Sequence, residues 1–286
     1  MCRILFLSAD FVDIATPEML LMVASALLEE NDFINAKKLL DIYMKKHGMV
    51  GIEEFLQVSA FCQEHFEINE KINTSAACYR MLKKAESRKE FPKLYGKTVA
   101  VVGNGPSQLG KGTGPEIDRH DIVIRFNTYT IDETFCSDYG TKISIWAPIR
   151  RHFTCANHDK SRYQMILGHC GMNCPMEYSW TESLVYFLKN TDVYVIPGHV
   201  LKELARESRM LTPTSGLRVL YWLKKVVKID RKNLNVYGFT LNAKQVDAPS
   251  NGLMKDKHHY GDENDYTAHH NFDAESNFLT EFLQKS

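Results

Sequence analysis

The sequence lacks several features that mark common classes of protein. It carries no net charge, because 35 Lys and Arg residues balance 35 Asp and Glu residues over 286 positions, and this balance argues against nucleic acid as a partner. No apolar run approaches the roughly 20 residues that span a bilayer. The apolar residues 4–7 are soon followed by Asp10 and Asp13, which does not suit a signal peptide. These absences favour a cytoplasmic protein.

The sequence also lacks the usual signs of a disulfide framework or a metal centre. Its seven cysteines are an odd number in a long chain, so reduced thiols are expected. It contains no Asp-x-Asp and no His-Glu-x-x-His, and we expect no metal. A zinc site remains open as an alternative at a loosely spaced set: Cys155, His158, His169, Cys170 and Cys174.

A charged stretch at 84–97 divides the chain into two parts. Before it, residues 17–87 carry apolar side chains at helical spacing with short breaks, which predicts helical hairpins. We therefore expect an α-helical subdomain over 1–90 and a second domain over 91–286.

In the second domain, short apolar runs alternate with helical patterns. The expected strands lie at 99–102, 122–124, 142–147, 165–167, 193–196 and 235–239, and the expected helices at 180–189, 200–210, 217–227 and 272–283. Such alternation predicts an α/β fold with a Rossmann-like, mainly parallel sheet.

Two of these runs end in polar loops. The first ends in Gly103-Asn104-Gly105-Pro106-Ser107, and the second in Arg125-Phe126-Asn127. Parallel strands end at one edge of a sheet, which is where open α/β sheets bind nucleotides. The spacing fits neither the dinucleotide fingerprint nor the P-loop. Asn104 and Asn127 can nevertheless bind ribose, phosphate or base without adding charge; a purely structural loop is the alternative.

Pro213-Thr214-Ser215-Gly216 opens a further helix. Thr or Ser at this position caps a helix, and the helix N-terminus favours an anion. An ordinary N-cap is the alternative interpretation.

Four histidines fall within thirteen polar residues, at 258, 259, 269 and 270. Histidine is the natural general acid or base near neutral pH. A metal site that also uses Asp262 and Asp265 is the rival hypothesis.

Taken together, these stretches resemble the four ordered motifs of the animal-type sialyltransferases, glycosyltransferase family 29. The loop and the Thr-Ser-Gly turn are also similar to bacterial sialyltransferases of a related family. The long, short, third and last motifs of the animal-type family resemble Val99–Asn127, Pro213–Phe239, His259–Asp262 and His270–Glu275, within a region of about 97–283.

The resemblance implies a GT-A-variant fold and inverting transfer from CMP-sialic acid to a sugar hydroxyl of a glycan or glycolipid, with no cofactor. Asn104 and Asn127 would hold the CMP moiety. The substrate-binding residues that it implies are Asn104, Gly105, Ser107, Asn127, Thr214, Ser215, Gly216, Tyr260 and Glu275.

The resemblance also implies roles for residues near the reacting atoms. His270 would be the general base and His259 would stabilise the departing phosphate. Ser215 and Gly216 would meet the phosphate or the sialic acid carboxylate, and Glu275 would orient the local fold or His270.

The chain departs from the animal enzymes at their disulfide. The long-motif cysteine falls near Thr98, and residues 213–239 contain no cysteine. This departure suits a reducing cytosol and favours a bacterial enzyme of lipopolysaccharide or capsule synthesis at the inner face of the membrane. CMP-Kdo as donor, or a non-catalytic scaffold that binds a nucleotide, are the alternatives. Acceptor, linkage, peripheral membrane association and oligomeric state stay open.

Overall fold

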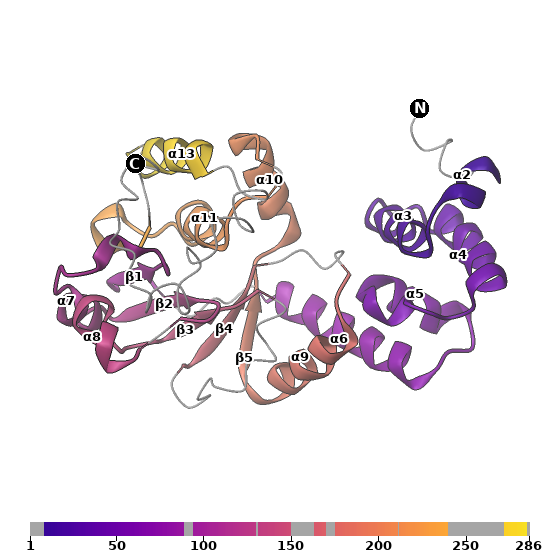
Figure 1. Ribbon diagram of the computed structural model, residues 1–286, viewed down its shortest axis with the longest axis horizontal. Helices are drawn as coiled ribbons and strands as arrows, with labels where there is room; N and C mark the ends of the chain where they lie inside the picture. Colours follow the sequence, from indigo (N-terminus) through magenta and orange to yellow (C-terminus); the bar gives the residue numbers. More distant parts are fainter. Residues whose placement is uncertain are drawn as a thin grey trace. The chain divides into compact units, whose positions relative to one another are not determined.

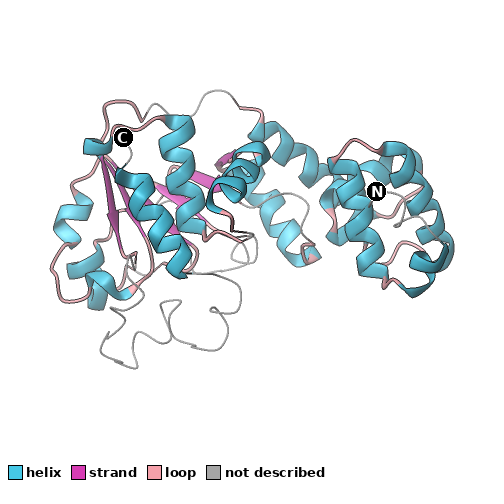
Figure 2. Cartoon of the chain, turned by 90° about the horizontal axis from the view of Figure 1, so that it is seen from above, coloured by secondary structure: helices cyan, strands magenta, loops and turns pink. Residues whose placement is uncertain are grey.

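A computed structural model describes residues 9–88, 94–129, 131–149, 163–169, 175–210, 212–239 and 272–284. The chain forms two compact units, which are Met1–Ala85 with Gly171–Asn190, and Glu86–Cys170 with Thr191–Ser286. Every described strand belongs to the second unit (Figure 2). The prediction of an α/β fold with a helical N-terminal region is confirmed. The grouping by contacts also places 171–190 with the N-terminal helices, whereas the sequence-based division assigns it to 91–286.

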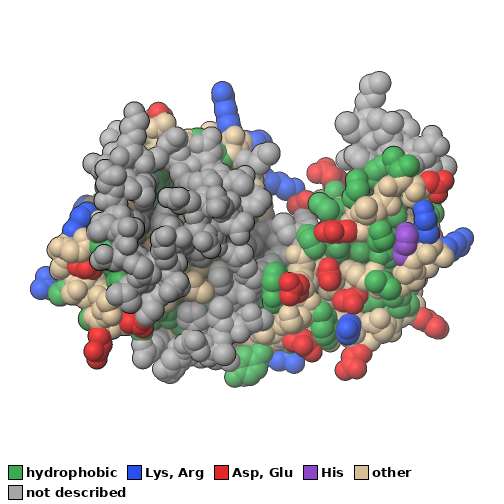
Figure 3. Space-filling view, viewed as in Figure 1, with side chains coloured by type: hydrophobic (Ala, Val, Ile, Leu, Met, Phe, Trp, Pro, Cys, Tyr) green, Lys and Arg blue, Asp and Glu red, His purple; other side chains and the backbone are tan. Residues whose placement is uncertain are grey.

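The first unit is built from helices around their own apolar core. Its helices are α2 (Ala9–Ile14), α3 (Pro17–Glu29), α4 (Phe33–His47), α5 (Leu56–His65), α6 (Glu70–Glu86) and α9 (Tyr178–Asn190). The apolar stripes predicted by helical spacing meet inside, where Leu20, Leu39 and Leu40 are buried. Outside, hydrophobic and charged side chains are interspersed on the face seen in Figure 3. No helix in the described part of the chain combines the length and apolar character of a membrane span.

The second unit contains a six-stranded sheet in which every neighbouring pair is parallel, in the order β5-β4-β3-β2-β1-β6. Figure 1 labels β1 to β5 of this sheet. The strands are β1 (Val99–Val102), β2 (Ile122–Phe126), β3 (Ile145–Ala147), β4 (Met165–Gly168), β5 (Asp192–Val195) and β6 (Leu234–Tyr237). Strand β3 is shorter than the run 142–147 predicts. The reason is local, because the main-chain N–H of Lys142 donates to the Asp118 carboxylate (2.9 Å).

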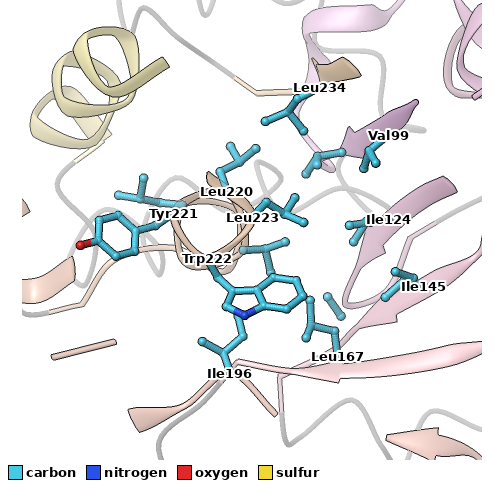
Figure 4. Close-up of a cluster of buried hydrophobic side chains, with 14 of the residues drawn as sticks. Val99, Ile124, Ile145, Leu167, Ile196, Leu220, Tyr221, Trp222, Leu223 and Leu234 are labelled. Atoms are coloured by element: carbon cyan, nitrogen blue, oxygen red, sulfur yellow. The ribbon is translucent and has the colours of Figure 1, made fainter. Parts of the chain in front are cut away.

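Helices cover both faces of the sheet, as the alternation along β1 dictates. Val99 and Val101 join the larger core with α10 (Gly198–Ser208), α11 (Ser215–Trp222) and α13 (Phe272–Gln284). Figure 4 shows Trp222 of α11 between its own helix and the sheet residues of this core. Ala100 and Val102 face the smaller core with α7 (Gly114–Asp118) and α8 (Glu133–Tyr139). The short helices α7 and α8 are absent from the sequence-based prediction, since neither spans two turns.

A buried arginine of β2 binds the end of α8 and the segment that follows it. The Arg125 side chain is 1% exposed. Its Nε donates to the carbonyl of Lys142 (2.9 Å), and its Nη2 donates to the carbonyl of Tyr139 (2.7 Å). Burial lowers the pKa of Arg125 to about 10, which Asp118 and then Tyr129 partly oppose, so the side chain is still a cation near neutral pH.

We expect Arg125→Met to destabilise the protein by at least about 2 kcal/mol, because each buried carbonyl left without a donor costs roughly 1–3 kcal/mol. Urea unfolding of the variant and the wild type measures the difference. Arg119→Met is the matched control, because Arg119 is exposed next to the same strand and its loss should have little effect. Equal stability of the two variants would contradict the structural role of Arg125.

Candidate functional site

The sheet has a topological switch point beside β1. From β1 the chain adds β2, β3, β4 and β5 on one side, and then returns to place β6 on the other side of β1. Open α/β sheets bind ligands in the crevice outside the carboxyl ends of strands at such a point. The Gly103–Ser107 loop follows β1, and Gly238 follows β6. The loop chosen from the sequence therefore lies where the topology favours a ligand.

The loops after β1 and β6 approach each other at backbone distance. Gly103 N–H donates to the carbonyl of Tyr237 (2.8 Å), and Gly105 N–H donates to that of Gly238 (2.9 Å). A Cβ at Gly103 would lie 2.6 Å from the Gly238 oxygen, and a Cβ at Gly238 would overlap the Gly103 carbonyl. Gly238 also has φ +69°, which favours glycine. Side chains at either position would force the two loops apart.

The Phe239 ring joins three stretches that the sequence analysis treats separately. A Cβ at Gly103 would lie 3.1 Å from the Cδ2 and Cε2 edge of the ring, while a Cβ at Gly216 would overlap Cε1 on the opposite edge. The ring also packs edge-on against Phe126, at 6.2 Å between centroids and 85° between planes. The end of β1, the end of β2 and the start of α11 therefore meet around one aromatic side chain.

The glycine-rich segment after β1 is held from α8. The Asp138 carboxylate accepts from the N–H groups of Gly110 and Gly112, both at 2.8 Å. The Tyr139 hydroxyl donates to the carbonyl of Gly105 (2.5 Å). These bonds fix the backbone of the loop from outside the sheet.

A second group of hydrogen bonds joins α7 and the residues that follow it to β6. The Tyr237 hydroxyl donates to Glu116 Oε1 (2.7 Å), and burial followed by Glu116 raises the pKa of that tyrosine. His120 Nδ1 lies 3.1 Å from the carbonyls of Glu116 and Ile117, which favours a proton on Nδ1. In that tautomer His120 Nε2 accepts from Asn235 Nδ2 (2.8 Å).

The two asparagines predicted to bind a nucleotide lie at the same edge but differ in their contacts. Asn104 Nδ2 donates to the carbonyl of Phe126 (3.2 Å), and among the described residues its Oδ1 meets no donor, so this oxygen can accept from a ligand. Asn127 is buried with φ +48°, and its Oδ1 accepts from Ile149 N–H (2.9 Å). Asn127 therefore also shapes the turn after β3. Ser107 ends the loop in a short 3-10 helix (Pro106–Gln108), and its Oγ accepts from Gln108 Nε2 (3.4 Å).

The start of α11 presents main-chain donors at this edge. Thr214 is the N-cap, and its Oγ1 accepts from Leu217 N–H (3.3 Å). Within the described part of the chain, neither Ser215 N–H nor Gly216 N–H finds an acceptor. Two such donors at a helix N-terminus suit an anion. Glu275, from α13, accepts from Thr214 N–H (3.0 Å) and from its hydroxyl.

The remaining candidates lie outside the described residues. These are His258, His259, Tyr260, Asp262, Asp265, His269 and His270, as well as Cys155, His158, Cys170 and Cys174. His169 is described; it is fully buried, and its Nε2 lies 3.3 Å from the carbonyl of Ala147. Over the described ranges, no three His, Cys, Asp or Glu side chains gather closely enough to hold a metal ion.

Sequence reasoning missed Asp138, and it included Gly238 and Phe239 only as the end of the stretch that resembles the short motif, without a role. Asp138 belongs to a polar stretch without a motif, and only the fold carries it to the glycine-rich loop. Gly238-Phe239 has a weak signal, since a glycine directly after a β-branched or aromatic run often marks a close backbone approach.

Fold and site together define a class: a doubly wound α/β protein with a glycine-bracketed loop and a helix N-terminus at the edge of the sheet where such folds bind ligands. Comparison with known proteins gives the family. The model of glycosyltransferase family 29 (sialyltransferase) matches residues 50–210, more than half of the chain. The chain belongs to this family.

Three individual proteins are similar to parts or most of this chain. Sialyltransferase-like protein 2 of Oryza sativa subsp. indica is 49% identical over 49 residues, which span 17% of this chain and 12% of the rice protein. A crystal structure of a mammalian sialyltransferase has a TM-score of 0.49 at 18% identity, covering 80% of this chain and 82% of that one. Another, in complex with Gal-beta-1-3GalNAc-ortho-nitrophenol, has a TM-score of 0.50 at 19% identity, covering 79% and 80%. At this identity the last likeness supports the fold.

We expect Gly216→Ala to destabilise the second unit by about 1–3 kcal/mol, because the added methyl group overlaps the Phe239 ring in a packed site. Gly198→Ala is a matched control. Gly198 also begins a helix, has no positive φ, and a Cβ there meets only Glu86 Oε1 at 3.6 Å. Urea unfolding should separate the two variants, and an equal effect would exclude the proposed contact with Phe239.

Proposed function

We propose that this chain transfers sialic acid from CMP-sialic acid to a sugar hydroxyl of a glycan acceptor, with inversion at the anomeric carbon and without a metal ion. The observation that carries the proposal is the pair of N–H groups at Ser215 and Gly216, placed beside the β1 loop in a chain of glycosyltransferase family 29. A monophosphate leaving group has a charge that such donors can meet. We also propose that the protein is bacterial and that its acceptor is a surface glycan; both parts of the proposal rest on the sequence alone.

Among the described residues, Asn104 would contact the nucleoside end of CMP, and Ser215 and Gly216 would contact its phosphate end. Asn104 Oδ1 is available to accept from the cytosine amino group or from a ribose hydroxyl. Ser215 and Gly216 N–H groups would bind the phosphate, or the carboxylate of the donor sugar. Neither contact adds a charge to the site.

The reaction follows from the roles assigned to the two histidines by resemblance. The acceptor oxygen attacks the anomeric carbon, and its proton passes to His270. The bond from that carbon to the phosphate oxygen breaks, and the electron pair leaves with CMP. His259 stabilises the phosphate by donating a hydrogen bond as negative charge develops.

The first test is a donor and acceptor screen with the full chain. We expect turnover with CMP-sialic acid, undiminished by EDTA, and a product whose anomeric configuration by NMR is opposite to that of the donor. The acceptor panel should include Gal-beta-1-3GalNAc glycosides, because a protein of similar fold binds one. Strong preference for CMP-Kdo would replace the donor assignment, and loss of activity with EDTA would refute metal independence.

His270→Ala tests the general base. We expect kcat to fall by roughly 10²–10⁴-fold, the usual contribution of a positioned acid or base. CMP binding should be retained, since His270 acts on the acceptor. His199→Ala is the control, because His199 is exposed on α10. Unchanged transfer by the His270 variant would show that another group, or none, acts as base.

A further inference from the structure

The buried carboxylate of Glu275 binds Thr214, the N-cap residue of α11, with both of its oxygens. Oε2 accepts from Thr214 N–H at 3.0 Å, and Oε1 accepts from the Thr214 hydroxyl. Glu275 is 7% exposed. A carboxylate that receives a separate donor at each oxygen has a defined orientation, and its hydrogen bonds are stronger than those between neutral groups.

Thr214 is in turn hydrogen-bonded to the first turn of α11. Its hydroxyl donates to Glu275 and at the same time accepts from Leu217 N–H (3.3 Å). Its carbonyl accepts from Arg218 N–H (3.1 Å), as in a regular helix start. The side chain and backbone of Thr214 are therefore occupied, whereas the next two N–H groups, of Ser215 and Gly216, have no acceptor among the described residues.

Contacts at the other end show that α13 lies along α11 in the same direction. The rings of Tyr221 and Phe282 are stacked at 5.3 Å between centroids. Lys224 Nζ donates to the carbonyl of Phe282 and lies 4.6 Å from its ring centroid. Glu275 lies near the start of α13, so its carboxylate is beside the positive ends of two helices, which stabilise a buried negative charge.

These contacts assign distinct tasks to neighbouring donors. Glu275 takes up the N–H and hydroxyl of the cap, and Phe239 fixes Gly216 from the other side. We propose that Glu275 is a positioning residue, which holds Thr214 so that the Ser215 and Gly216 N–H groups are aligned for the anionic group of the donor. This inference rests on the proposed function. It replaces the substrate-binding role that the resemblance implies for Glu275 with a role that acts through Thr214.

Glu275→Gln tests the inference with two ligands that differ only at the phosphate. Glutamine keeps one acceptor oxygen, but its amide nitrogen cannot accept from the Thr214 hydroxyl, so the charge-assisted hydrogen bond that this hydroxyl donates is lost. We expect CMP to bind about tenfold more weakly, in line with the loss of one hydrogen bond to a charged group. Cytidine, which lacks the phosphate, should bind with unchanged affinity in an NMR titration. Glu281→Gln, exposed on the same helix, is the matched control.

Thr214→Val provides a second route that leaves α13 untouched. It removes the hydroxyl and keeps the N–H, and it should weaken CMP but not cytidine. Because Glu275 acts through Thr214, the two substitutions should not add. The fold-loss of CMP affinity in the double variant should be smaller than the product of the fold-losses in the two single variants.

The outcomes separate this inference from the proposed function. If the wild type binds CMP and Glu275→Gln binds it equally or more tightly, the positioning role is wrong while the function stands. Equal weakening of CMP and cytidine would show a general structural effect and would also overturn the positioning role. If the wild type binds no CMP, the proposed function and the inference that depends on it are both wrong.

Discussion

The close approach of two backbones at Gly103 and Gly238 is the constraint on which the site depends. It extends the pairing of β1 and β6 beyond the ends of the two strands. It leaves no room for a Cβ at either glycine. The Phe239 ring follows directly, and it fills the space between Gly103 and the start of α11 at Gly216. Because these contacts are at van der Waals limits, the loop after β1 and the N-terminus of α11 have one relative placement.

Polar side chains bind main-chain atoms of the segments that connect the strands and helices. Asp138 accepts from two glycine N–H groups, Asp118 accepts from the N–H of Lys142, and Arg125 donates to two carbonyls. Buried backbone groups must find such partners when no strand supplies them. Asp138 thereby holds the glycine-rich segment after β1, while Asp118 and Arg125 hold the connection from α8 to β3.

The start of α11 shows how one helix terminus can serve two purposes. Its cap residue, Thr214, is bound by Glu275 of α13, and the following N–H groups of Ser215 and Gly216 stay available. This division explains why a carboxylate can be tolerated close to a proposed anion site. The negative charge is directed at the cap, and the N–H groups that the phosphate would use have no acceptor among the described residues.

The sequence by itself determined the succession of strands and helices, the glycine loop after β1 and the cap at Thr214, because periodicity, turn residues and capping act over a few neighbouring positions. It also carried the family resemblance. The tertiary structure alone decided that Phe239 joins Gly103 to Gly216, that Asp138 holds the loop and that Glu275 binds Thr214. These partners are far apart along the chain, and their pairing depends on strand order and on how α8, α11 and α13 pack, which no local pattern encodes.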